Sequence, residues 1–269
     1  MIFIQNFDSV LSHGSSSGKD YIFSYANQTI PLSLSIKESN KLVIFLPGAF
    51  DLSQNLPKFQ RKSYFAELPY NLISIFDPTL IMNPNLSIGW FQGDKNTDLF
   101  SIVYPILSSL IKRINIPTEN ILFFATSAGG IPALKLATKF RGASVYLGNI
   151  QVDALKYYKK FVDKMLISCY GGIDNLELYE HKLNVYNEFG DINVFYAQNK
   201  CDFLHYVEHF LPFVERSRSN FSNFEGVVYE HKESEHNPIS KEIELKVIRD
   251  IFEKHTIKEA FSDITIRIV

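Results

Sequence analysis

The chain has 269 residues, of which 46% are hydrophobic and 21% charged, and its formal net charge at neutral pH is −2. This length suits one large globular domain that needs no disulfide or metal to hold its core. The charge balance excludes the basic excess on which nucleic-acid binding depends, so we expect no nucleic-acid partner. The two cysteines form no metal or redox motif, which favours a reduced, cytoplasmic protein.

The first twenty residues end in a Gly/Ser-rich stretch, HGSSSGKD, for which we expect a turn or a flexible segment. They lack a basic region followed by a long apolar run, so no signal peptide is predicted. No apolar stretch in the chain is long enough to span a bilayer. Any role at a membrane is therefore expected to be peripheral.

Short apolar runs bounded by turn residues follow, which is typical of strands. The run at 29–36 alternates apolar and polar residues, so we expect a strand with one face in water. The runs at 41–46 and 71–76 are continuously apolar, which indicates strands buried on both faces. The expected strands are 21–25, 29–36, 41–46, 71–76, 121–125, 144–149, 192–198 and 227–231, with the alternating tail 262–269 as an edge strand.

Helical spacing of apolar residues separates these runs. At 97–113 we expect Thr97 to cap a helix and Pro105 to kink or break it. Residues 151–189 are helical and irregular, and we expect them to form a small cap or lid inserted into a single domain, 1–269. Helices are also expected after the tight turn within 120–140, at 203–218 and at 239–254. The alternation predicts an α/β fold with a mainly parallel sheet and helices on both faces.

The segment ATSAGG, residues 125–130, lies between an apolar strand and a helix. A strand-to-helix elbow that presents a nucleophile needs small residues on both sides of it, because the backbone is strained there and the strand and helix approach closely. Ala125 and Gly129 flank Ser127 at the required distance, with alanine where glycine is usual. The elbow would place Ser127 at a helix N-terminus, where the N–H of Ala128 can serve an oxyanion.

A second oxyanion donor is expected from the loop after an earlier strand. FLPGAF, residues 45–50, stands in that place. Gly48 would let the backbone approach a substrate closely, and Ala49 or Phe50 would point an N–H inward. The sequence leaves open which of the three donates.

In folds with such a nucleophile elbow, the triad residues occur along the chain in the order Ser, then Asp or Glu, then His. We therefore expect the acid and the base in the loops that follow later strands. Asp202 follows the strand 192–198 directly, whereas Asp191 precedes it and lies at the wrong end. His236 lies in the loop after 227–231, with His231 as the rival base. Serine becomes a nucleophile when a neutral imidazole takes its proton, and a carboxylate then stabilises the imidazolium. Ser127, Asp202 and His236 therefore predict an α/β-hydrolase fold with a catalytic triad.

Other side chains carry weaker signals. Trp90 is the only tryptophan, and it is interpreted as a platform for a sugar or acyl donor or, alternatively, as a packing anchor. Arg61, in the basic cluster KFQRK, is a candidate for an anionic substrate group, and Phe50 for substrate contact. His205 and His209 fall on the helix after Asp202, where surface or packing roles are expected. No metal-spaced His/Cys cluster and no phosphate-binding loop occur, so neither a metal nor a tightly bound cofactor is expected.

These motifs together resemble the bacterial capsule and surface-polysaccharide biosynthesis proteins of the α/β-hydrolase fold, which include polysaccharide O-acetyltransferases. The matching pieces are LPGAF, ILFFATSAGGIPALKLA, AQNKCDFLHYVEHF and KESEHNP, in order over about residues 40–255. The resemblance implies that Ser127 accepts an acetyl group from acetyl-CoA and passes it to a sugar hydroxyl of a glycan. It also implies peripheral association with a capsule-synthesis complex.

Two other functions remain open. An esterase acting on carbohydrate or small-molecule esters would use the same acyl-enzyme, with water in place of the sugar hydroxyl. A non-catalytic accessory protein of polysaccharide biosynthesis or secretion would keep the fold as a relic, and an intact triad argues against it.

Overall fold

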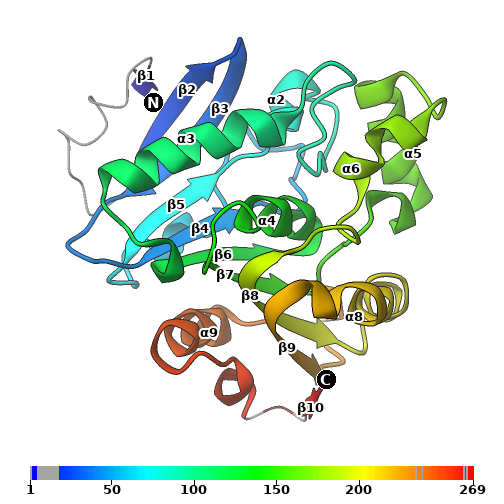
Figure 1. Cartoon of the computed structure of the whole chain (residues 1–269). Helices are drawn as coiled ribbons and strands as arrows, with labels where there is room; N and C mark the ends of the chain where they lie inside the picture. Colours follow the sequence, from blue (N-terminus) through cyan, green and yellow to red (C-terminus); the bar gives the residue numbers. More distant parts are fainter. Residues whose placement is uncertain (1, 5–17, 234, 238, 263, 265) are drawn as a thin grey trace.

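The computed structural model describes residues 2–4, 18–233, 235–237, 239–262, 264 and 266–269 (Figure 1). Most of the N-terminal segment for which we expected flexibility lies outside these residues, although Lys19 and Asp20 belong to a strand. The described strands are β1 (Ile2–Ile4), β2 (Lys19–Tyr25), β3 (Gln28–Ser35), β4 (Leu42–Leu46), β5 (Asn71–Ile75), β6 (Ile121–Thr126), β7 (Ser144–Gly148), β8 (Gly190–Asn199), β9 (Phe221–Tyr229) and β10 (Ile266–Ile268).

These strands form one sheet in the order β1-β2-β3-β5-β4-β6-β7-β8-β9-β10. The six strands from β5 to β9 in this order are parallel to one another. Antiparallel pairing occurs where β3 joins β2 and β5, and where β10 joins β9 at the other edge. The mainly parallel sheet and the edge strand expected at the C-terminal tail are thereby confirmed.

Helices cover both faces of the sheet. Alternate residues of β4 belong to two separate cores: Ile44 lies in the core that includes residues of α3, α4 and α8, and Phe45 lies in the core that includes residues of α9. The apolar residues of β4 are thus buried on both faces, as parallel strands require. The described helices are α2 (Pro78–Met82), α3 (Leu99–Arg113), α4 (Gly130–Ala137), α5 (Lys159–Tyr170), α6 (Glu180–Leu183), α7 (Phe203–His205), α8 (Leu211–Ser217) and α9 (Lys241–Lys254), with a π-helical turn, Tyr206–Phe210, between α7 and α8.

Helix α3 differs from expectation at two points. Asp98, not Thr97, caps it, because the Asp98 carboxylate accepts the N–H of Phe100 at 3.0 Å. The helix also continues through Pro105 without a break. Pro105 stands on the outer face of α3, and Ser101, whose carbonyl would have bonded to the missing N–H, is exposed. Water can therefore satisfy that carbonyl, which lowers the cost of the proline.

Strand β3 has no wet face, contrary to its alternating sequence. Ser33 and Ser35 are as buried as the leucines between them. Ser33 pairs with Ser74 of β5, and Ser74 donates a hydrogen bond to the carbonyl of Gln60 at 2.8 Å. The segment after Phe59 thus lies over this face of the sheet, and its position could not be inferred from the periodicity of β3 alone.

Residues 151–189 leave the sheet between β7 and β8 and contain α5, α6 and short 3-10 turns. Figure 1 shows α5 and α6 grouped at one side of the sheet. Lys182 fastens this insertion to the loop before α3: its buried ammonium donates to the carbonyls of Gln92 and Asp94 and lies over the rings of Tyr170 and Tyr179. Among the described residues, no helix is long and apolar enough to cross a lipid bilayer.

Candidate active site

The elbow after β6 places Ser127 at the carboxyl edge of the sheet. Its φ is 53°, in the left-handed region that a serine rarely adopts. A Cβ on Gly129 would lie 2.9 Å from the carbonyl oxygens of Leu46 and Pro47, and one on Gly130 would overlap Ile150. Both glycines are therefore needed, because the first turn of α4 packs directly on the end of β4 and on the loop after β7.

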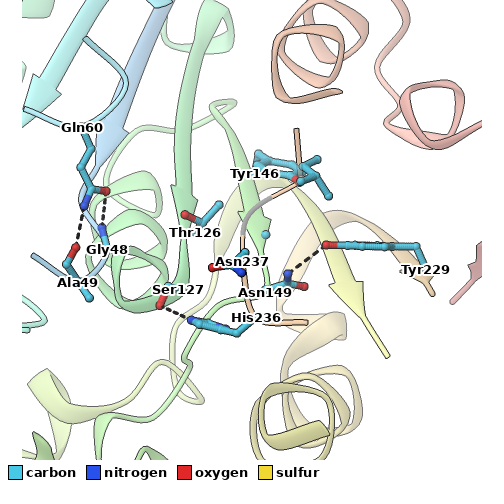
Figure 2. Close-up of a pocket in the computed structure, with 12 residues that line it drawn as sticks. Gly48, Ala49, Gln60, Thr126, Ser127, Tyr146, Asn149, Tyr229, His236 and Asn237 are labelled. Carbon is cyan, nitrogen blue, oxygen red and sulfur yellow. Dashed lines mark hydrogen bonds between the residues drawn. The ribbon is translucent and has the colours of Figure 1, made fainter. Parts of the chain in front are cut away.

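Two further strand ends bring side chains to Ser127. His236, in the loop after β9, has its Nε2 3.0 Å from Ser127 Oγ. Figure 2 marks this contact with a dashed line. The other ring nitrogen, Nδ1, lies 2.7 Å from Oδ2 of Asp202, which follows β8. Burial alone would raise the pKa of Asp202, but hydrogen bonds from His205 and His236 outweigh it and hold the pKa well below the usual range. Asp202 is thus a stable carboxylate beside His236.

The loop that carries His236 is held by a residue that sequence analysis missed. The amide of Asn199, at the end of β8, donates to the carbonyls of His231 and Glu235 and accepts the N–H of His231. These bonds use the backbone of His231, the rival base, to shape the turn that presents His236. Nothing in the spacing of Asn199 indicated this role, because it depends on two loops meeting in space.

The hydrogen bonds of the loop after β4 reduce the number of candidate oxyanion donors. Gly48 donates its N–H to Oε1 of Gln60 at 2.9 Å, and Phe50 donates to the carbonyl of Ser87 at 2.7 Å. Neither N–H is available in this structure, which corrects the assignment of Gly48 as a donor. Within the described part of the chain, the N–H of Ala49 has no such partner. Ala49 and Ala128, in the first turn after the elbow, are the candidates left.

A cavity of about 270 Å³ opens beside Ser127 and His236. Its walls come from the loop after β4, the carboxyl ends of β6, β7 and β9, and the loop before α9 (Figure 2). The hydroxyl of Tyr229 is engaged by the amide of Asn149 at 3.0 Å. The hydroxyl of Tyr146 lies beside Gly148, and no described atom forms a hydrogen bond with it. A polar group of a ligand can therefore pair with Tyr146.

Arg61 is a structural residue and not a substrate anchor. Its guanidinium, 8% exposed, forms two hydrogen bonds of 2.8 and 2.9 Å with the carboxylate of Glu244 and a third of 2.9 Å with Thr126 Oγ1. Tyr64 completes the cluster by donating to the same carboxylate. The cluster ties α9 to the residue immediately before the nucleophile. Arg61 does not line the cavity beside Ser127, and its Nε and Nη2 donors are engaged by Glu244 and Thr126, so the substrate-binding assignment is corrected to a structural role.

Trp90 and Phe50 also do not face the cavity. Trp90 is 1% exposed, and its indole Nε1 donates to Oε1 of Gln151 at 2.5 Å, so it cannot stack on a sugar. It is the packing anchor that was the alternative interpretation. Phe50 is buried against Phe76 in an edge-to-face contact. Both residues are buried because they contact residues that are distant in the sequence.

His205 and Gln151 stand close to the proposed triad although sequence analysis did not place them there. His205 is 1% exposed, and its Nδ1 lies 2.9 Å from Oδ1 of Asp202. Gln151 donates from Nε2 to Ser127 Oγ at 3.3 Å. The spacing of three residues from Asp202 could have suggested His205, since residues three apart share one face of a helix. No sequence signal pointed to Gln151.

Asp202, His205 and His236 also offer one potential metal-ligating atom each within 4.8 Å of one another. Each oxygen of the Asp202 carboxylate, however, already forms a hydrogen bond with a histidine ring nitrogen, at 2.7 Å for His236 and 2.9 Å for His205. A metal ion would have to displace both protons and separate these atoms. The contacts fit a proton-transfer site better than a metal site.

No protein-family model and no curated protein matches the chain. Solved structures with a similar fold include the capsule O-acetyltransferase of Neisseria meningitidis serogroup A, as a mutant in complex with CoA (14% identity, TM-score 0.60, 77% of this chain and 89% of that one). Others are the 2,6-dihydroxy-pseudo-oxynicotine hydrolase (15%, 0.59, 89% and 69%) and dipeptidyl peptidase 4 of Porphyromonas gingivalis (10%, 0.61, 92% and 35%). At these identities the likeness shows the fold alone, which is the α/β-hydrolase fold.

Removal of one partner of the Arg61–Glu244 pair is expected to destabilise the protein strongly. Arg61→Met leaves the Glu244 carboxylate buried without its cation, which costs about 3–5 kcal/mol. Urea denaturation followed by circular dichroism measures the loss. The double variant Arg61→Met/Glu244→Leu should recover most of it, because no charge then stays buried. Equal losses in the single and double variants would contradict this account.

Acid should destabilise the fold through His209. This residue is fully buried and accepts the N–H of Val152 at 3.4 Å, and burial lowers its pKa from 6.5 to about 3. Between these values the unfolded chain binds a proton that the folded chain does not. The free energy of unfolding should therefore fall as the pH falls below about 6.5, by up to about 1.4 kcal/mol per unit from this group.

Urea denaturation at a series of pH values tests this linkage. His209→Asn keeps an acceptor for Val152 and removes the titrating ring, so its slope between about pH 6 and pH 4.5 should be smaller than that of the wild type by about 1.4 kcal/mol per unit. Parallel slopes in the two proteins would rule out His209 as the source.

Proposed function

We propose that this chain is a serine-nucleophile acyl-transfer enzyme, an O-acetyltransferase that carries an acetyl group from acetyl-CoA through Ser127 to a hydroxyl of a bacterial capsular or surface polysaccharide. The observation that carries the proposal is the continuous contact from Ser127 through His236 to Asp202 at the wall of a cavity. Three groups from separate strand ends converge in the order and geometry that activates a serine.

In the first half of the reaction, His236 takes the proton of Ser127 as Oγ attacks the thioester carbonyl of acetyl-CoA. Asp202 stabilises the imidazolium that forms. The carbonyl oxygen becomes an oxyanion, and the N–H groups of Ala128 and Ala49 are the proposed donors to it. The tetrahedral intermediate then expels the CoA thiolate, which receives the proton from His236. The product is acetyl-Ser127 with free CoA.

In the second half, a sugar hydroxyl enters the cavity and gives its proton to His236 as its oxygen attacks the acetyl ester. The intermediate collapses, Ser127 Oγ leaves and recovers the proton, and the acetylated glycan departs. Tyr146 supports a hydroxyl-bearing acceptor, because it lines the cavity and its hydroxyl has no hydrogen-bond partner among the described residues. Its unpaired O–H can bond a hydroxyl of the sugar.

The choice of a transferase rests on the resemblance in the sequence motifs and on the similarity in fold to a capsule O-acetyltransferase that has been crystallised with CoA. Acetyl-CoA fits a cytoplasmic protein, and peripheral association with a capsule-synthesis complex belongs to the same proposal. An ester hydrolase is the second candidate, favoured by the similarity in fold to a known hydrolase. It would use the same acyl-enzyme with water as acceptor. The contact between Ser127 and His236 argues against a non-catalytic accessory protein.

Incubation with acetyl-CoA tests the proposed reaction. The protein alone should release CoA slowly, and bacterial surface glycans from which ester groups have been removed should accelerate the release. Mass spectrometry should find acetyl-Ser127 and a glycan heavier by one acetyl group, and Ser127→Ala should abolish both. The esterase alternative holds if simple acetyl esters are hydrolysed rapidly, acetyl-CoA is ignored and acetylated glycan loses its acetyl groups.

Tyr146→Phe should weaken the acceptor step selectively. Loss of one hydrogen bond to the sugar is expected to raise the KM for the glycan about 5- to 10-fold, corresponding to about 1–1.4 kcal/mol. The rate at which acetyl-CoA forms the acyl-enzyme should not change. Tyr229→Phe is the control for the loss of a cavity-wall hydroxyl that already has a partner in the protein, because Tyr229 accepts the N–H of Asn149. Equal effects of the two variants on KM would refute the role assigned to Tyr146.

A further inference from the structure

A ring of hydrogen bonds closes behind the proposed triad. Gln151 lies at its centre: its Oε1 is 2.5 Å from the indole Nε1 of Trp90, and its Nε2 is 3.3 Å from both Ser127 Oγ and His205 Nε2. His205 returns to the triad through Asp202. The side chains of Gln151, Trp90, His205 and Asp202 are all less than 10% exposed, so water cannot substitute for the contacts among them.

The indole of Trp90 fixes the direction of every bond in this ring. An indole N–H only donates, so Gln151 must turn its carbonyl oxygen toward Trp90 and its NH₂ group toward Ser127 and His205. The NH₂ group in turn only donates. Ser127 Oγ is therefore an acceptor from Gln151, and its own proton is left to point at His236.

The same reasoning fixes the tautomer of His205. Its Nε2 accepts from Gln151, so the ring proton is on Nδ1 and is donated to Oδ1 of Asp202. Burial lowers the pKa of His205, which keeps the ring neutral and in this state. The ring stacks on His236 with the centroids 4.0 Å apart. Asp202 thus receives one N–H from each histidine, one on each oxygen.

We infer that Gln151 is a catalytic residue and that His205 and Trp90 are positioning residues, which together orient the proton of Ser127 toward His236 and stabilise negative charge on Oγ. This inference rests on the proposed role of Ser127 as the nucleophile. The N–H of Gln151 bonds Oγ when it attacks the donor and again when it leaves the acetyl ester. His205 donates a hydrogen bond to Asp202, and this bond reduces the strength with which the carboxylate attracts the proton of His236.

The reaction of the full chain with a fluorophosphonate, measured as a second-order rate across pH, tests the inference without any acetyl donor or glycan. Gln151→Met keeps the length of the side chain and removes its donors, so labelling should slow about 10- to 100-fold at every pH. Gln151→Glu should be slower still, because its carboxylate accepts the proton of Ser127 in competition with His236. Trp90→Phe should fall between these variants and the wild type, since the amide of Gln151 is then free to turn.

Two substitutions of His205 separate a positioning role from a structural one. His205→Phe keeps a ring against His236 but removes the N–H to Asp202, so the acidic limb of the pH–rate profile should move to higher pH by about half a unit or more. Asn can place an N–H where Nδ1 lies, so His205→Asn should return the limb toward its wild-type position. A variant that merely loses stability would lower the melting temperature and leave the limb in place.

The outcomes are distinguishable. Wild-type protein that is folded but not labelled at Ser127 would refute the proposed function itself. Wild-type protein that is labelled, together with wild-type rates in Gln151→Met and an unmoved limb in His205→Phe, would overturn the inference alone. Circular dichroism on each variant identifies any that fails to fold, and Gln151→Glu and His205→Asn, the closest in shape to the native residues, then provide the deciding comparison.

Discussion

The site depends first on the strained turn at Ser127. A left-handed serine between β6 and α4 costs about 1–3 kcal/mol and persists only where the surroundings allow no alternative. Here Gly129 contacts the end of β4 and Gly130 contacts Ile150, so the start of α4 has no other place to lie. Because β6 is in the middle of the parallel sheet, this turn lifts Oγ at the edge where the loops after β8 and β9 meet.

Buried and half-buried polar side chains then hold each loop against that turn. Gln60 fixes the loop after β4, Asn199 fixes the loop that carries His236, and the Arg61–Glu244 pair holds Thr126 from behind. Each of these groups satisfies backbone or side-chain partners that burial would otherwise leave unpaired, which is costly in a low-dielectric interior. The geometry of the site therefore depends on polar side chains from several distant segments of the chain.

The insertion between β7 and β8 is connected to the same network. The ammonium of Lys182 donates to carbonyls of the loop at 92–97. In return, the side-chain amide of Gln92 donates to the backbone carbonyl of Lys182. Trp90, two residues earlier, orients Gln151, which lies at the start of the insertion. The insertion is thus connected to Ser127 through the indole of Trp90 and the amide of Gln151.

The sequence by itself determined the fold class, most strand positions, and Ser127, Asp202 and His236 as a group, because strand periodicity, elbow glycines and chain order are local properties. His205 and Gln151 as neighbours of the triad, the engagement of Gly48 by Gln60, and the burial of Trp90 and Arg61 were decided only in the tertiary structure. Each of these depends on a partner supplied by another loop or helix. A polar side chain carries no local sign of whether its partner will be water, substrate or a buried group from a distant segment.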